Sequence, residues 1–133
     1  MKRMRSVRWL LAGACILSLG LFSCGESEPP QEGEAYSPAQ FDKMLQANKI
    51  VVVDFKADWC VPCKQLAPKL ERIAAAHADS IMLKKVDVDL SRALADSLRI
   101  NSIPYVAKFV NGVKVKEFMG NVDDATIEAL FKP

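Results

Sequence analysis

The stretch Trp59-Cys60-Val61-Pro62-Cys63-Lys64 decides the fold of this 133-residue chain, because it joins two different elements. It closely follows Ile50 to Phe55, a largely β-branched run short enough to be a buried strand. After it, Leu66, Leu70 and Ile73 recur at helical spacing and predict a helix from the cysteines to about residue 78. The pattern therefore places two cysteines where a strand passes into the start of a helix.

The segments on either side predict an α/β fold in the order α-β-α-β-α-β-β-α. Asn111-Gly112 lies between two apolar runs and is a strong signal for a β-hairpin. The early alternation gives parallel strands, and the hairpin adds an antiparallel pair. We therefore expect a mixed sheet of four to five strands flanked by helices on both faces. The other predicted elements are a helix beginning at Ser37, a strand over 81–88, a helix over 91–98, strands over 105–110 and 113–118, and a last helix capped by Asp123 or Asp124.

The N-terminus has the pattern of a secretory signal. Residues 1–8 contain four Lys or Arg, and residues 9–22 are apolar. Fourteen residues suit a signal-peptide core and are too few for a membrane span, which needs about 20. The segment ends in Leu21-Phe22-Ser23-Cys24, which resembles the lipobox of bacterial lipoproteins, so we predict cleavage before Cys24 and lipid attached to it. The alternatives are an ordinary signal with an incidental Cys24, and a second lipobox ending at Cys15.

These features predict three parts: a lipoprotein-type signal peptide over 1–23, a flexible tether over 24–36 and one folded domain over 37–133. The tether is acidic and rich in Pro and Gly, without apolar periodicity. A lipid anchor would hold the domain on a membrane of the bacterial cell envelope, facing the periplasm. Whether that is the inner or the outer membrane stays open.

The charge of the chain argues against a nucleic-acid partner. The formal net charge of +2 comes from the leader, because residues from Cys24 onward carry 14 Lys and Arg against 16 Asp and Glu. A basic domain face would be needed to bind nucleic acid, and none is indicated.

Two of the four cysteines remain for chemistry in the folded domain. Cys60 and Cys63 enclose only two residues, so a disulfide between them would stabilise the fold little. At a helix N-terminus the first thiol is favoured as a thiolate, which makes Cys60 the candidate nucleophile and Cys63 the resolving thiol. The alternative, half a zinc site, lacks partners, since His77 is the only histidine and no second cysteine pair exists. We expect no metal and no cofactor.

Beyond the cysteines, the chain from Ser37 to the C-terminus resembles the thioredoxins. The matching motifs occur in the order and at the spacing of that family. They are Val53-Asp54-Phe55, Trp59 to Lys64, Pro68, Lys85, Asp87-Val88-Asp89, Ile103-Pro104, Asn111-Gly112 and Gly120.

The resemblance implies roles for two charged residues. Asp54 would lie behind Cys63 and help take its proton, and burial in an apolar strand should raise its pKa. Lys85 resembles the lysine that pairs with that acid. The plainer interpretations are an outward-facing strand acid and a solvated charge at a strand end.

The resemblance also implies a substrate-binding surface around the cysteines. Pro104 would follow a cis peptide bond opposite the pair, with the backbone of Ile103 pairing with an extended substrate. Alternatives are an ordinary trans Pro104, a core position for Trp59 and a plain turn at Gly120. The expected substrate-binding residues are Trp59, Val61, Pro62, Ile103, Pro104 and Gly120.

Two residues depart from the family pattern. Val61 stands where cytoplasmic thioredoxins carry glycine, in the dipeptide that tunes the reduction potential. Lys56 occupies a place where many thioredoxins have tryptophan. Its ammonium either favours the Cys60 thiolate or points to water.

Three functions compete. The first is a membrane-anchored monomer that reduces disulfide-bearing client proteins outside the cytoplasm and is recharged by a transmembrane thiol-relay protein. The second is an oxidase or isomerase using the same pair, although no large insertion or dimerisation segment is present between Cys63 and Pro104. The third is a non-catalytic thioredoxin-like binding module, which an intact cysteine pair disfavours.

Overall fold

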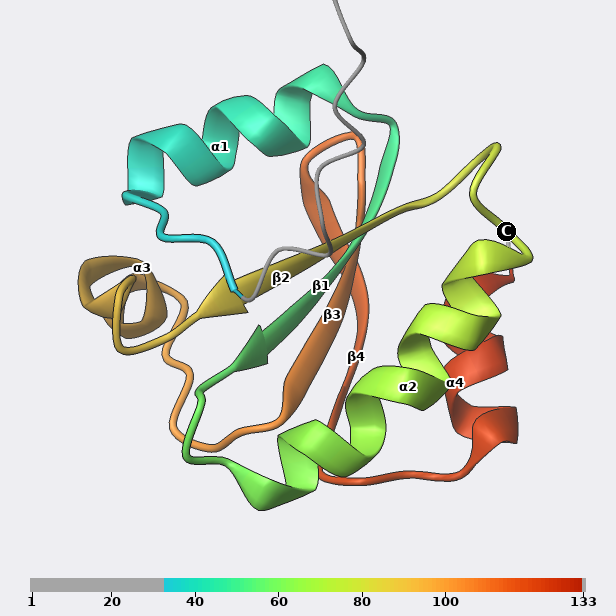
Figure 1. The fold of residues 1–133 in the computed structure, drawn as a ribbon. Helices are drawn as coiled ribbons and strands as arrows, with labels where there is room; N and C mark the ends of the chain where they lie inside the picture. The colour runs from blue at the N-terminus through green and yellow to red at the C-terminus, as the bar shows by residue number, and fades with distance from the viewer. Residues whose placement is uncertain (1–32, 133) are drawn as a thin grey trace, which may run out of the picture.

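The computed structural model describes residues 33–132, so the predicted signal peptide, Cys24 and most of the predicted tether lie outside the described residues. The predicted order of elements is confirmed (Figure 1). None of the helices in the described range is long and apolar enough to cross a membrane. The elements are α1 (Pro38–Ala47), β1 (Ile50–Lys56), α2 (Val61–Ala75), β2 (Met82–Asp87), α3 (Arg92–Ser97), β3 (Tyr105–Val110), β4 (Val113–Met119) and α4 (Asp124–Phe131).

The strands form one four-stranded mixed sheet in the order β2-β1-β3-β4. β1 and β2 are parallel, whereas β1–β3 and β3–β4 are antiparallel. Figure 1 shows α1 and α3 on one side of this sheet and α2 and α4 on the other. The predicted α/β architecture with helices on both faces is thereby confirmed.

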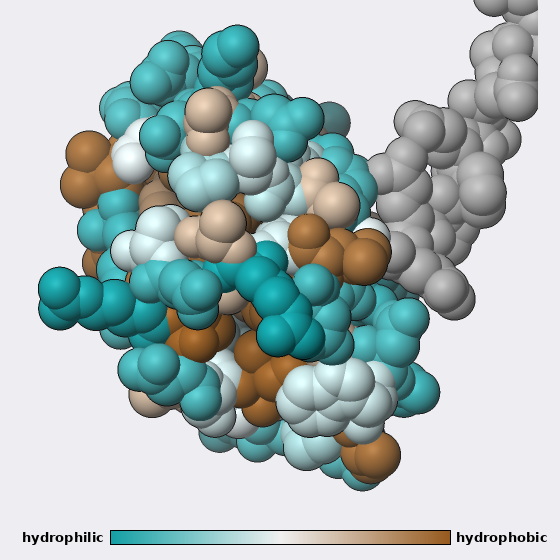
Figure 2. Space-filling model, turned by 90° about the vertical axis from the view of Figure 1, so that its left-hand side faces the viewer, coloured by the Kyte–Doolittle hydropathy of each residue, from teal (hydrophilic) through white to brown (hydrophobic). Residues whose placement is uncertain are grey.

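Alternating side chains of β1 supply both layers of the core. Val51, Val53 and Phe55 pack beneath α1 and α3, while Val52 packs beneath α2 and α4. By the same alternation Asp54 points to the α2 side. The face covered by α1 and α3 is largely hydrophilic on its outside, with hydrophobic residues in separate small groups (Figure 2).

Local signals set the ends of several elements. Ser37 and Gln40 form the predicted capping box, with Gln40 N donating to Ser37 Oγ at 3.3 Å and Ser37 N to Gln40 Oε1 at 2.9 Å. Asn111 and Gly112 both have positive φ, as a tight hairpin turn requires. Helix α2 ends three residues earlier than expected, because its last turn tightens through bonds such as His77 N to the Ala74 carbonyl.

The chain joins the sheet before the predicted start of the domain. Glu34 forms a parallel bridge to β2, donating its N–H to Lys85 O at 2.9 Å and accepting from Asp87 N at 3.1 Å. Tyr36 N donates to Ser91 Oγ at 2.9 Å. Residues 34–36, which composition assigned to the tether, thus pair with the domain, because β2 is an edge strand with free backbone groups.

Candidate active site

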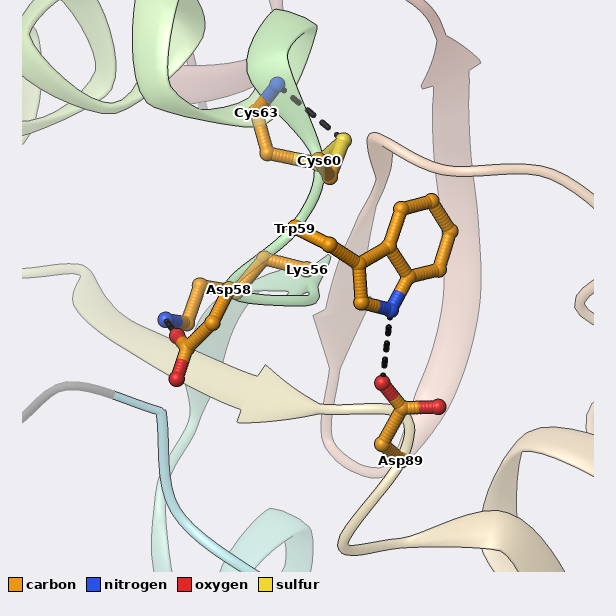
Figure 3. Close-up of a disulfide and its surroundings, with 6 residues drawn as sticks. All are labelled: Lys56, Asp58, Trp59, Cys60, Cys63 and Asp89. Carbon is orange, nitrogen blue, oxygen red and sulfur yellow. Dashed lines mark hydrogen bonds and ion pairs between the residues drawn. A yellow bond between two sulfur atoms is a disulfide. The ribbon is translucent and has the colours of Figure 1, made fainter.

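The two cysteines occupy the first turn of α2 and are joined by a disulfide, with their Cα atoms 5.3 Å apart. Cys60 is the N-cap residue, and its Sγ accepts a hydrogen bond from Cys63 N at 3.2 Å (Figure 3). Cys60 and Cys63 are 3% and 2% exposed. Once the disulfide is reduced, the same N–H group and the helix dipole favour a thiolate at Cys60.

A small apolar cluster surrounds the disulfide and includes one of the predicted substrate-binding residues. Ala57 is buried against the cysteines, and Val88 and Ile103 pack on them from outside. The Ile103–Pro104 peptide bond is cis, as the resemblance implied. The structure therefore brings Ile103 and Pro104 to the redox pair although about forty residues separate them in sequence.

Gly120 lies next to this segment, since its N–H donates to Pro104 O at 2.8 Å. Its φ is +84°, a conformation that side chains other than glycine rarely adopt. A Cβ built on Gly120 would have no neighbouring atom within 4 Å. The open space fits the expectation that a substrate backbone approaches closely here.

Trp59 is 69% exposed, so it does not belong to the core. Its indole Nε1 donates to Asp89 Oδ2 at 2.8 Å, across the gap between the cysteine loop and the end of β2 (Figure 3). The ring lines a hollow together with Val88, Ile103 and the segment from Ile100 to Ser102. Sequence reasoning assigned Asp89 no role beyond its place in a family motif, and no neighbouring residue marks it as the partner of the indole.

Val61 and Pro62, the dipeptide between the cysteines, are both exposed at the start of α2. Val61 is 63% exposed beside the redox pair. Together with Trp59 it gives the redox pair an apolar rim.

Asp54 is buried, with 1% of its surface exposed, as the apolar strand predicted. Within the described part of the chain, its Oδ1 atom has no hydrogen-bond partner. Burial raises the pKa of Asp54 to about 7, and the positive charges of Lys85 and Lys56 partly oppose that rise. A carboxyl group with this pKa can take up or release a proton near neutral pH.

Lys85 lies directly opposite Asp54 in the β1–β2 register, yet it does not form the expected ion pair with it. Its Nζ pairs instead with the carboxylate of Glu71 on α2. Glu71 is half exposed and keeps much of its hydration, whereas an ion pair at Asp54 would require desolvating both charges. The resemblance had not indicated Glu71, and its place among polar helix residues does not distinguish it.

Lys56 does not simply point to water. Its side chain is 16% exposed, and its Nζ lies 2.8 Å from Asp58 Oδ1 (Figure 3).

No group of three or more His, Cys, Asp or Glu side chains within residues 33–132 is placed to hold a metal ion.

Comparison with known proteins gives the family. The thioredoxin family model matches residues 33–132, so the chain belongs to the thioredoxin family. It is 38% identical over 87 residues to the probable thioredoxin-2 of Caenorhabditis elegans, covering 65% of this chain and 60% of that protein. It is 40% identical over 91 residues to a thioredoxin of Alicyclobacillus acidocaldarius, covering 68% of this chain and 87% of that protein.

The fold agrees with solved structures of the same family. A thioredoxin from Plasmodium falciparum superimposes with a TM-score of 0.65 at 34% identity, covering 71% of this chain and 91% of that one. The chain spans less than two thirds of the C. elegans relative and 55% of the mitochondrial thioredoxin of Bos taurus.

Proposed function

We propose that this protein is a thiol-disulfide oxidoreductase that reduces disulfides in client proteins. The observation that carries the proposal is the Cys60–Cys63 disulfide at the N-terminus of α2, close to Ile103 and the cis Pro104. A disulfide that encloses only two residues adds little stability to the fold. Its cysteines are placed to exchange disulfides with other proteins.

The first step needs the reduced pair. The Cys60 thiolate attacks one sulfur of the client disulfide, which breaks the client's S–S bond and forms a mixed disulfide between Cys60 and the client. The other client sulfur leaves as a thiolate and takes a proton from solvent. The exposed Trp59 and Val61 and the backbone at Ile103 would hold the client segment during this step.

In the second step Cys63 releases the client. Its thiol passes a proton to the carboxylate of Asp54, and the resulting thiolate attacks the sulfur of Cys60. The Cys60–Cys63 disulfide forms and the second client sulfur leaves as a thiolate that is protonated. The client has then gained two electrons from the cysteine pair and two protons, one from solvent and one equivalent to the proton that Cys63 passed to Asp54. The pKa of about 7 at Asp54 supports this role, because the acid is partly ionised at neutral pH.

Trapping tests the reaction directly. In the Cys63→Ser variant the first step proceeds and the second cannot, so mixed disulfides should accumulate on Cys60 and be identified by mass spectrometry. The Cys60→Ser variant is the control and should capture far fewer proteins. Equal capture by both variants, or none by either, would support a non-catalytic binding module instead.

We further propose that the reaction occurs outside the cytoplasm, on a lipid anchor at Cys24. The lipobox-like Leu21-Phe22-Ser23-Cys24 and the short apolar leader support this placement. A protein there does not meet the cytoplasmic reductase system, so a transmembrane thiol-relay protein would supply its electrons. Deleting such a relay should leave the Cys60–Cys63 pair oxidised in cells, and a pair that stayed reduced would contradict this supply route.

A further inference from the structure

Lys56 lies close to the buried acid of the site and on the same side of the sheet. Asp54 and Lys56 are two residues apart on β1, so their side chains leave the same face about 6.6 Å apart along the strand. Lys56 ends β1, just before the loop that leads to Cys60. Its side chain is largely buried, which is unusual for a lysine.

Two contacts keep the Lys56 side chain in place. Its Nζ lies 2.8 Å from Asp58 Oδ1. Its stem lies against Gly33, where a Cβ would come within 2.7 Å of Lys56 Cε and 3.0 Å of Asp87 Cβ. Gly33 also has a φ of +48°, which favours glycine. Glycine at position 33 therefore leaves space for the Lys56 side chain. A larger residue at position 33 would occupy that space.

We propose that Lys56 is a positioning residue for the proton transfer at the redox pair, acting through Asp54 by stabilising its ionised form. The inference rests on the proposed role of Asp54 as acceptor of the Cys63 proton. Many thioredoxins carry tryptophan at the position of Lys56. That neutral residue would not supply a positive charge beside Asp54.

The other charges around Asp54 decide how much Lys56 contributes to stabilising the ionised carboxylate. On β2, Lys85 lies opposite Asp54 but is paired with Glu71 of α2, which opposes its effect. Asp87 lies opposite Lys56, and its Oδ1 accepts hydrogen bonds from the backbone N–H groups of Asp89 and Leu90.

The other neighbours of Asp54 alter this balance little. On β3 its partner is the apolar Val106, and the nearest lysine of that strand, Lys108, donates to the Lys132 carbonyl. Asp58 neutralises Lys56 only in part, because its side chain is 77% exposed and its charge is screened by water. Lys56 therefore acts on Asp54 as a net positive charge.

The test is the titration of Asp54 in the oxidised full-length protein, followed by NMR of its side-chain carbonyl carbon. In this state the cysteines do not titrate. Lys56→Met should raise the midpoint by about half to one pH unit, since a positive charge that favours the ionised carboxylate is lost. Lys56→Arg keeps the charge and should restore the midpoint. Lys56→Gln is a second neutral variant in case methionine disturbs the fold.

The matched control is Lys84→Met, which removes a strand lysine on the opposite face of the sheet, where it pairs with Glu34. It should leave the Asp54 midpoint unchanged. A midpoint that does not move in either neutral Lys56 variant overturns the proposal.

The pH profile of client reduction separates this inference from the function it rests on. In Lys56→Met the rise of the rate with pH should shift upward by the same amount as the Asp54 midpoint. A moved midpoint with an unmoved profile would overturn the proposal by showing that Asp54 does not take the proton. A wild-type protein that reduces no disulfide would instead refute the proposed function, whatever the Asp54 midpoint does.

Discussion

Asp54 on β1 and Lys85 on β2 lie directly opposite each other, yet Lys85 pairs with Glu71 and leaves Asp54 Oδ1 without a hydrogen bond within residues 33–132. The ionised acid is therefore stabilised only from a distance, by two lysines whose own partners are more exposed carboxylates. This arrangement keeps the pKa of Asp54 near neutrality, where it can exchange a proton with Cys63.

We expect Asp54→Asn to change stability in a pH-dependent way. The folded pKa of about 7 lies above the ordinary value of 3.8, so the unfolded chain loses this proton first as the pH rises. Wild-type stability should fall between about pH 4 and pH 7, and the variant should escape that loss. Between pH 4 and pH 8 the free energy of unfolding of the variant should rise relative to wild type by up to about 4 kcal/mol. Urea unfolding of the oxidised proteins at pH 4 and pH 8 measures it, and equal differences at both pH values would contradict the burial account.

Glu71→Gln should shift the pH dependence of client reduction toward lower pH. The substitution frees Lys85 from its partner and removes a negative charge that raises the pKa of Asp54. Asp79→Asn, a change at an exposed acid beyond the end of α2, is the control and should leave the profile in place. A shift toward higher pH in Glu71→Gln would show that Lys85 does not act on Asp54.

The bridge of Glu34 to β2 should contribute measurably to stability. Both Glu34→Pro and Glu34→Ala remove the ion pair to Lys84 and the hydrogen bond from the Tyr36 hydroxyl. Only the proline variant also removes the N–H that donates to Lys85 O. We expect the proline variant to unfold with a free energy about 1 kcal/mol lower than the alanine variant, as measured in urea. Equal values for the two would mean that the backbone pairing adds nothing.

Gly120 should tolerate asparagine better than alanine. A Cβ at this position meets no other atom, so the cost is that of a φ of +84° in the backbone, on the order of 1–2 kcal/mol for alanine. Asparagine adopts positive φ more readily and should cost less. Thermal unfolding of both variants compares them; if alanine is as stable as wild type, the backbone conformation is not what selects glycine.

The sequence predicted the elements whose signals are local. The capping box at Ser37 and the Asn111-Gly112 turn each depend on residues within a few positions, and both are present. The cysteine pair was found for the same reason. Each of these features is encoded where it occurs.

The features that the sequence did not predict depend on residues far apart. Which acid Lys85 meets is decided by the packing of α2 on β2. The bond from Trp59 to Asp89 spans 30 residues, and the edge that Glu34 joins exists only after β2 has formed. Such contacts follow from the tertiary arrangement, so a pattern of neighbouring residues does not show them.

The reduction potential of the Cys60–Cys63 couple tests the central claim most directly, because it decides in which direction electrons move. The dipeptide between the cysteines contains Val61, so the value does not follow from family membership. Equilibration of the full-length protein with dithiothreitol or glutathione buffers gives it. The reductase account predicts a potential near about −270 mV, and a potential near about −120 mV would contradict it and identify an oxidase.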